Sequence, residues 1–367
     1  MRILKEKVNK MPNAKVVDYG SCVLHVGHNA FSKGLKVGAN LVNTALLAKS
    51  VYGFFKYSTI RREDFAAELI DLEKEEKNFI RHVDSRWLSL KPSLERVDEQ
   101  FEAIENYFLK TVNEKADAGD KNYKDAQKTE YYGMAVGQLR RPECRFMIKQ
   151  VIYICEKFGP FMHKMQSSGP QIGFLYADCS RLLLDVLSCF LESSVLKDDM
   201  EAKDLIKLDL SKSNKDVPKM SPSADACYKR LSKTCQKNAA STVVKMLATT
   251  AGYMQRELHP LKSKLVRNLR VLDPKKSASL TDGGASAIVE SAKEFARFSD
   301  TEMDRLALQW NALVLAKFTL QKKQRLDDFY SQCLRSLRCN DDQYLELGKF
   351  LKMALCLPSG NASVERG

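Results

Sequence analysis

Cys22, His25 and His28 are the residues whose types and spacing most resemble a metal site. Their Cys-x-x-His-x-x-His order brings together one thiolate and two imidazoles, which are ligands that suit zinc. A structural zinc site needs a fourth ligand, and the next histidine and cysteine along the chain are His82 and Cys144. Two interpretations stay open: a zinc site, or a junction whose Cys and His side chains are packed and hydrogen-bonded. We favour the packed junction and predict no bound metal.

Other patterns that carry chemistry are missing from the sequence. It has no Gly-x-Ser-x-Gly nucleophile motif, no Gly-x-Gly-x-x-Gly dinucleotide motif and no Walker loop. Neighbouring carboxylates such as Asp327 and Asp328 are typical of solvated helix faces. The sequence therefore gives no support to a conventional small-molecule enzyme, and we predict neither a cofactor nor a small-molecule substrate.

The two tryptophans have different contexts. Trp310 lies in an apolar run and is expected in the core. Trp87 follows Arg86 at the start of an amphipathic stretch. Large aromatic side chains commonly anchor helix junctions, so packing is the simplest interpretation of Trp87 as well.

Composition limits the class of protein. The chain has 367 residues, of which 44% are hydrophobic and 29% charged, and it is expected to fold around a core. Stretches without a charged residue, such as 165–177, are all shorter than the roughly 20 apolar residues that a spanning helix needs, so we predict no membrane partner. Ten cysteines without a Cys-x-x-Cys pair indicate reduced intracellular thiols.

The net charge of +13 is concentrated in one part of the chain. Residues 201–276 contain 17 Lys and Arg against 7 Asp and Glu. A basic surface attracts polyanions through counterion release, which makes nucleic acid the first partner to consider. A solvated, lysine-rich helical face without a DNA role would explain the same charge, and both interpretations stay open.

Most of the chain has helical periodicity. Apolar residues recur every three or four positions from Leu94 to Phe108 and from Val151 to Met165, which predicts one buried face on each helix. A further apolar helix is expected over 345–357. The segment 15–26 mixes β-branched and aromatic residues, so we expect one or two short strands that lead into a helix opening near His28.

Three of these segments, in this order, resemble signatures of the hAT superfamily of transposases and the host proteins derived from them. Cys22-Val-Leu-His25, followed by His28, is similar to the family's Cys-x-x-His element. Asp84-Ser-Arg86-Trp87 is similar to its Arg-Trp element. The C-terminal stretch 356–367, which contains Glu365, resembles its Leu-Pro-x-x-Asn-Ala-x-x-Glu-Arg signature.

The resemblance implies an α/β ribonuclease-H-like core interrupted by a large helical insertion, with a predominantly helical chain overall. We expect a partial core over residues 1–87, a helical insertion domain over 88–321 and a dimerisation segment that returns to the core over 322–367. Active relatives hold two divalent metals with three acidic residues, and Glu365 matches the third. The other two would precede the Cys-x-x-His element, so we expect this chain to lack them.

The resemblance also implies functions. In relatives, the tryptophan that matches Trp87 supports a flipped base while the arginine that matches Arg86 contacts DNA; without the acids, the pair could equally be retained for packing. We predict a non-catalytic, transposase-derived nuclear protein that forms homodimers and binds DNA nonspecifically. One alternative is a fragment of an active, Mg²⁺-dependent transposase. Another is a helical protein-interaction module with no DNA role.

Overall fold

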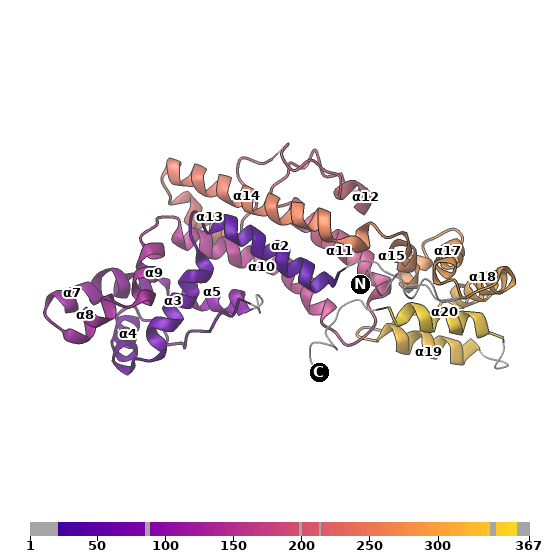
Figure 1. The fold of residues 1–367 in the computed structure, drawn as a ribbon, viewed down its shortest axis with the longest axis horizontal. Coiled ribbons are helices and arrows are strands. Elements are labelled where there is room, and N and C mark those ends of the chain that lie inside the picture. The colour runs from indigo at the N-terminus through magenta and orange to yellow at the C-terminus, as the bar shows by residue number, and fades with distance from the viewer. Residues whose placement is uncertain (1–20, 85–88, 198–199, 213, 338–342, 358–367) are drawn as a thin grey trace, which may run out of the picture.

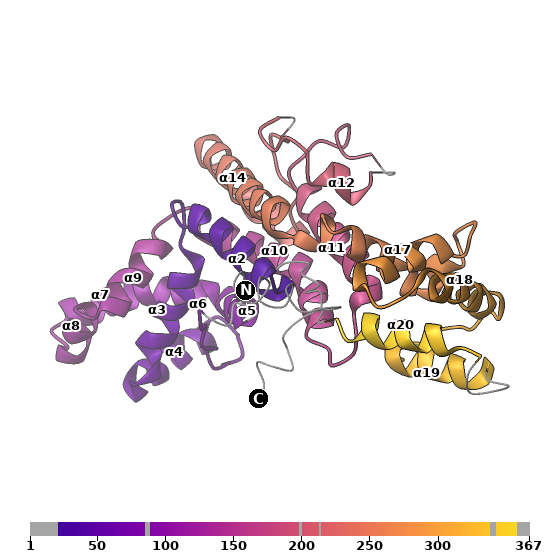
Figure 2. The same ribbon diagram turned by 45° about the vertical axis from the view of Figure 1, so that its right-hand side comes forward.

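The computed structural model describes residues 21–84, 89–197, 200–212, 214–337 and 343–357 as an assembly of helices. Within these ranges it has no β-strand, and an isolated antiparallel bridge joins Leu191 to Asn214. The prediction of a predominantly helical chain is confirmed. The expected ribonuclease-H-like α/β core has no counterpart in the described residues. Figures 1 and 2 show groups of helices that follow one another along the long axis of the molecule.

The first group of helices packs around aromatic side chains. Its members are α3 (Thr44–Lys56), α4 (Thr59–Asp71), α5 (Leu90–Glu99), α6 (Phe101–Asn106), a π-helical turn (Tyr107–Thr111), α7 (Val112–Asp117), α8 (Lys121–Gln127) and α9 (Glu130–Leu139). Phe54 and Phe55 of α3 lie 4.7–6.4 Å, between ring centroids, from Tyr107 and Phe108 of the π-helical turn. The apolar stripe predicted from Leu94 to Phe108 is buried, as expected, although α5, α6 and the π-helical turn share it.

The central group holds the longest helices. It consists of α2 (Val23–Gly38), α10 (Cys144–Met165), α11 (Ile172–Leu187), α12 (Ala202–Leu205), α13 (Pro222–Lys229) and α14 (Lys233–Glu257). The predicted stripe from Val151 to Met165 is buried on α10. In both views α2 and α14 lie side by side (Figures 1 and 2).

The strand expected before His28 is a helix where the structure describes it. Helix α2 begins at Val23, so Val23–Val26 are helical rather than extended. The buried residues Val23, Val26, Ala30 and Gly34 recur at helical spacing along one face. Packing of this face against neighbouring helices outweighs the β-propensity of valine. Residues 15–20 of the predicted strand lie outside the described ranges.

The last group forms the other end of the molecule. It comprises α15 (Lys264–Leu269), α16 (Pro274–Ser277), α17 (Ala285–Phe295), α18 (Asp300–Leu315), α19 (Leu326–Leu337) and α20 (Leu345–Leu355), with short 3₁₀ turns at His259–Leu261 and Arg270–Leu272. Trp310 is buried as predicted, and its indole Nε1 donates to the Gly283 carbonyl at 2.9 Å. The apolar helix expected over 345–357 is confirmed as α20.

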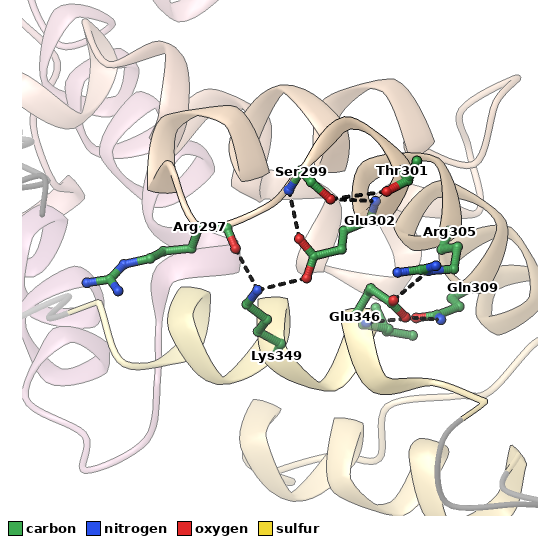
Figure 3. Close-up of polar contacts among 9 residues, drawn as sticks. Arg297, Ser299, Thr301, Glu302, Arg305, Gln309, Glu346 and Lys349 are labelled. Carbon is green, nitrogen blue, oxygen red and sulfur yellow. Dashed lines mark hydrogen bonds and ion pairs between the residues drawn. The ribbon is translucent and has the colours of Figure 1, made fainter. Parts of the chain in front are cut away.

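Side-chain hydrogen bonds attach α20 to α18 (Figure 3). Glu346 accepts from Arg305 Nε at 2.6 Å and from Gln309 Nε2 at 2.7 Å. Lys349 pairs with Glu302 at 3.1 Å and donates to the Arg297 carbonyl at 2.5 Å. Ser299 and Glu302 also form a capping box that begins α18.

The predicted domain boundaries at residues 87 and 321 stay a prediction. The first of them falls at 85–88, outside the described residues. Helices on either side of it pack together: α2 lies on α14, and α3 lies on α9 and α5. No helix in the described ranges is long and apolar enough to span a membrane.

Candidate nucleic-acid interface

The residues of the predicted Cys-x-x-His element lie at the start of α2. Cys22 is the residue before the first helical turn, His25 is exposed and His28 is half-buried. Burial, and secondarily the neighbouring His25, lower the pKa of His28, so its imidazole is neutral at neutral pH. Within the described ranges no three His, Cys, Asp or Glu side chains gather closely enough to hold a metal ion.

The other predicted site residues fall outside the structural description. Arg86 and Trp87 lie within 85–88, and Glu365 lies within 358–367. Their predicted roles in DNA contact and metal binding therefore stay predictions. The site that the structure does describe is built on α2 and α14.

Glycines let α2 and α14 approach closely. A Cβ on Gly34 would lie 2.1 Å from Thr250 Oγ1 and 2.9 Å from the Met246 carbonyl oxygen. A Cβ on Gly38 would lie 2.9 Å from Met246 Sδ. Since Gly34 faces Thr250 and Gly38 faces Met246, the helices run antiparallel. The small residues allow backbone contact between the two helices.

The solvent-facing sides of this helix pair are basic. Of the charged residues on the two helices, one is acidic, Glu257 at the C-terminal end of α14. The lysines and the arginine of the pair are exposed, and none of them forms an ion pair with another described residue. They are Lys33, Lys36, Lys233, Lys237, Lys245 and Arg256. The exposed positions between these cations on α14 are short and polar, such as Asn238, Ser241 and Thr249. Such a surface leaves room for a phosphate backbone.

Tyr253 joins the basic residues of the two helices. The Lys33 ammonium from α2 lies 5.2 Å from the Tyr253 ring centroid, and the Arg256 guanidinium from α14 lies 5.9 Å from it. These distances allow a cation–π interaction. The Tyr253 ring therefore lies close to one cation from each helix.

Elsewhere in the basic segment 201–276 the charge is partly neutralised. Lys203 pairs with Glu201 at 3.2 Å and Lys229 pairs with Asp225 at 2.6 Å. Lys212 pairs with Asp209 at 3.3 Å and Lys264 pairs with Glu290 at 2.6 Å. On α14, by contrast, none of the four cations has an acidic partner among the described residues.

Comparisons with known proteins add no relative. No protein-family model, curated protein or solved structure matches this chain.

Sequence reasoning missed Lys33, Lys36 and Tyr253 as parts of this surface. A signal was present, because the sequence has no Asp or Glu between Asp18 and Glu63. The basic window over 201–276 was found, but the pairing of α14 with a helix about 200 residues earlier in the chain could not be read from local patterns.

Proposed function

We propose that this chain binds nucleic acid through the phosphate backbone, using the exposed sides of α2 and α14. The observation that carries the proposal is the set of exposed cations on this helix pair, which have no acidic partner among the described residues. Lysines without such a partner can neutralise phosphates and release counterions without first breaking an ion pair.

Binding of this kind is not specific for sequence. Contacts to phosphates position a protein on nucleic acid, whereas contacts to base edges specify a sequence. The basic side chains of α2 and α14 are mostly lysine, which acts as a flexible point charge rather than as a planar fork. We therefore propose nonspecific binding with strong dependence on salt.

The hAT resemblance gives this activity a proposed origin. The ordered Cys-x-x-His, Arg-Trp and C-terminal signatures support descent from a transposase, with residence in the nucleus. Glu365 is the one residue matched to the family's metal-binding acids, and a single carboxylate cannot hold two metals. The proposal assigns DNA binding to the chain.

Charge-neutralising variants test the proposed surface. Changing Lys237, Lys245 and Arg256 of α14 to Gln removes three exposed cations that have no described ion-pair partner. We expect weaker binding to a short fluorescent DNA duplex, and a slope of log affinity against log salt that is smaller by about 3, because each phosphate contact contributes about 0.9. Fluorescence anisotropy at several salt concentrations measures both.

A matched control removes the same charge from paired lysines. Lys203, Lys212 and Lys229 lie in the same basic segment, and each pairs with a nearby acid. The triple Gln variant of these residues should bind DNA nearly as well as the unaltered chain. Equal losses in the two variants would mean that net charge, rather than this surface, governs binding.

Protein association is a second candidate function, favoured by exposed leucines on α18 and at the start of α20. Leu308 and Leu315 are 70% and 77% exposed on α18, and they lie one heptad apart on the same helix face. Leu345 at the start of α20 is 61% exposed. The hAT resemblance implies that relatives pair through the segment that contains α19 and α20, so we propose a second copy of this chain as the partner.

Light scattering tests self-association. We expect a dimer for the unaltered chain and a monomer for the double variant Leu308→Asp, Leu315→Asp, because charge on an apolar interface costs binding energy. The control Ile70→Asp places a charge at a 74% exposed apolar position on α4 and should stay dimeric. A chain that is monomeric at every accessible concentration would contradict the proposal.

A further inference from the structure

A pocket of about 530 Å³ lies between α11, the segment 200–205 and the turn 270–276, apart from the outer face of α14. Pockets that hold small organic ligands typically have volumes of about 300–1,000 Å³. Part of its wall is apolar and consists of Leu184, Met200 and Leu205. The rest of the wall carries charged and polar groups.

Three basic residues from three elements line this pocket. Arg181 belongs to α11, Arg270 to the 3₁₀ turn after α15, and Lys276 to α16. None of the three side chains forms an ion pair or a hydrogen bond with another described residue. Arg270 and Lys276 are half-buried, so leaving them without an anion costs more than it would at an exposed site. The Arg270 guanidinium lies 5.8 Å from the centroid of the Tyr176 ring.

The two acidic residues in the pocket wall form their ion pair and hydrogen bond with groups other than the three cations. Glu201 pairs with Lys203 at 3.2 Å. Asp273 Oδ1 accepts from the Lys275 backbone N–H at 3.0 Å and caps the start of α16. Neither carboxylate forms a direct ion pair with the three cations, although Lys203 and, to a smaller degree, Arg270 lower the pKa of Glu201. Cations outnumber carboxylates in the wall, which favours an anionic ligand.

Ser180 adds a buried donor in the same wall. Its Oγ is buried and has no hydrogen-bond partner among the described residues. Helical serine hydroxyls usually donate to a carbonyl one turn earlier, and a buried polar atom without a partner is uncommon. Because this oxygen is buried, it does not face the open volume of the pocket, and the anion site depends on the three cations.

We propose that this pocket binds a small organic phosphate monoester. Arg181, Arg270 and Lys276 hold the phosphate. The apolar body of the ligand lies against Leu184, Met200 and Leu205. A dianionic phosphate matches three cations that line one pocket better than a single carboxylate does. Such a group occurs on a free nucleotide and at the 5′ end of a DNA strand, and the experiment separates these sources.

Isothermal titration calorimetry of the full chain tests the proposal. The probes are adenosine monophosphate, adenosine, a 5′-phosphorylated tetranucleotide and the same tetranucleotide with a 5′ hydroxyl. We expect saturable binding of at least one phosphorylated probe, and binding of its unphosphorylated counterpart that is weaker by about tenfold or more. Preference for the nucleotide identifies a free ligand, and preference for the phosphorylated tetranucleotide identifies a DNA end. Equal binding with and without the phosphate, or no binding of either phosphorylated probe, would overturn the proposal.

Variants separate this pocket from the surface on α2 and α14. Arg270→Gln and Lys276→Gln should each weaken binding of the phosphorylated probe about tenfold. Lys275→Gln is the matched control, since Lys275 is an exposed neighbour that does not line the pocket. The α14 variant Lys237→Gln, Lys245→Gln, Arg256→Gln should keep full affinity for the nucleotide. The nucleotide titration therefore still tests the pocket if the surface on α2 and α14 does not bind DNA. A loss in Lys275→Gln equal to that in Arg270→Gln would contradict the assignment of the pocket.

Discussion

Glu346 shows how one charged side chain can hold two helices of this protein together. Its side chain is 7% exposed, yet Arg305 and Gln309 donate hydrogen bonds to it. Burial acts to raise the pKa of Glu346, but the hydrogen bonds from Gln309 and Arg305 outweigh it and hold the pKa below its ordinary value. The carboxylate is therefore charged at neutral pH and fixes the start of α20 against α18.

Glu302 makes the attachment of α20 sensitive to acid. The Ser299 backbone N–H and then the Lys349 ammonium lower the pKa of Glu302 to about 2. A lowered folded-state pKa stabilises the fold fully above the ordinary value of 4.5, and this contribution is lost as pH falls toward 2. We expect urea denaturation to show a steeper loss of stability over this interval for the unaltered chain than for Glu302→Gln.

The control for this measurement lies on the same helix. Asp304 is an exposed acid of α18 that forms no ion pair with another described residue. Asp304→Asn should retain the pH dependence of the unaltered chain. Identical pH profiles for Glu302→Gln and the unaltered chain would show that the capping box and Lys349 do not stabilise the attachment of α20.

At the scale of elements, the contact between α2 and α14 depends on Gly34. A methyl group there would meet the Thr250 hydroxyl and the Met246 backbone carbonyl, and the backbone cannot move aside cheaply. We expect Gly34→Ala to lower the free energy of unfolding by about 2–3 kcal/mol, as overpacking in a closely packed interior does. Chemical denaturation followed by circular dichroism measures the change.

Gly137 on α9 provides the matched comparison for this substitution. No atom lies within 4 Å of a Cβ built at Gly137, and its backbone is helical. Gly137→Ala should therefore raise the free energy of unfolding by about 0.4–1 kcal/mol, since alanine restricts the unfolded chain. A stabilising effect of Gly34→Ala would show that α2 and α14 are not packed as described.

At the scale of the whole molecule, local patterns predicted the helices better than their arrangement. The apolar stripe from Val151 to Met165 correctly predicted α10, because burial of one helix face imposes a period of 3.6 residues on the sequence. The strand prediction was wrong for Val23–Val26, since β-branched residues fit either state until packing decides. Its expected strands were part of the ribonuclease-H-like prediction, and the described part of that segment is helical.

The candidate site was predictable only in part, because it depends on a long-range contact. The basic character of α14 was visible in the excess of lysine over 201–276. The partnership of Lys33 with Tyr253 and Arg256 joins residues about 220 positions apart, and no local pattern specifies it. The half-buried cations Arg270 and Lys276 were counted in the same window, but their shared pocket follows from the packing of α11 against the turn after α15.

The salt dependence of DNA binding by the unaltered chain tests the central claim most directly. If the basic side chains of α2 and α14 contact phosphates, the slope of log affinity against log salt should be steep and negative. A value of about −5 is expected when all of these cations take part, at about 0.9 per contact. A slope near zero, or no binding to duplex DNA at low salt, would contradict the proposal that this surface binds nucleic acid.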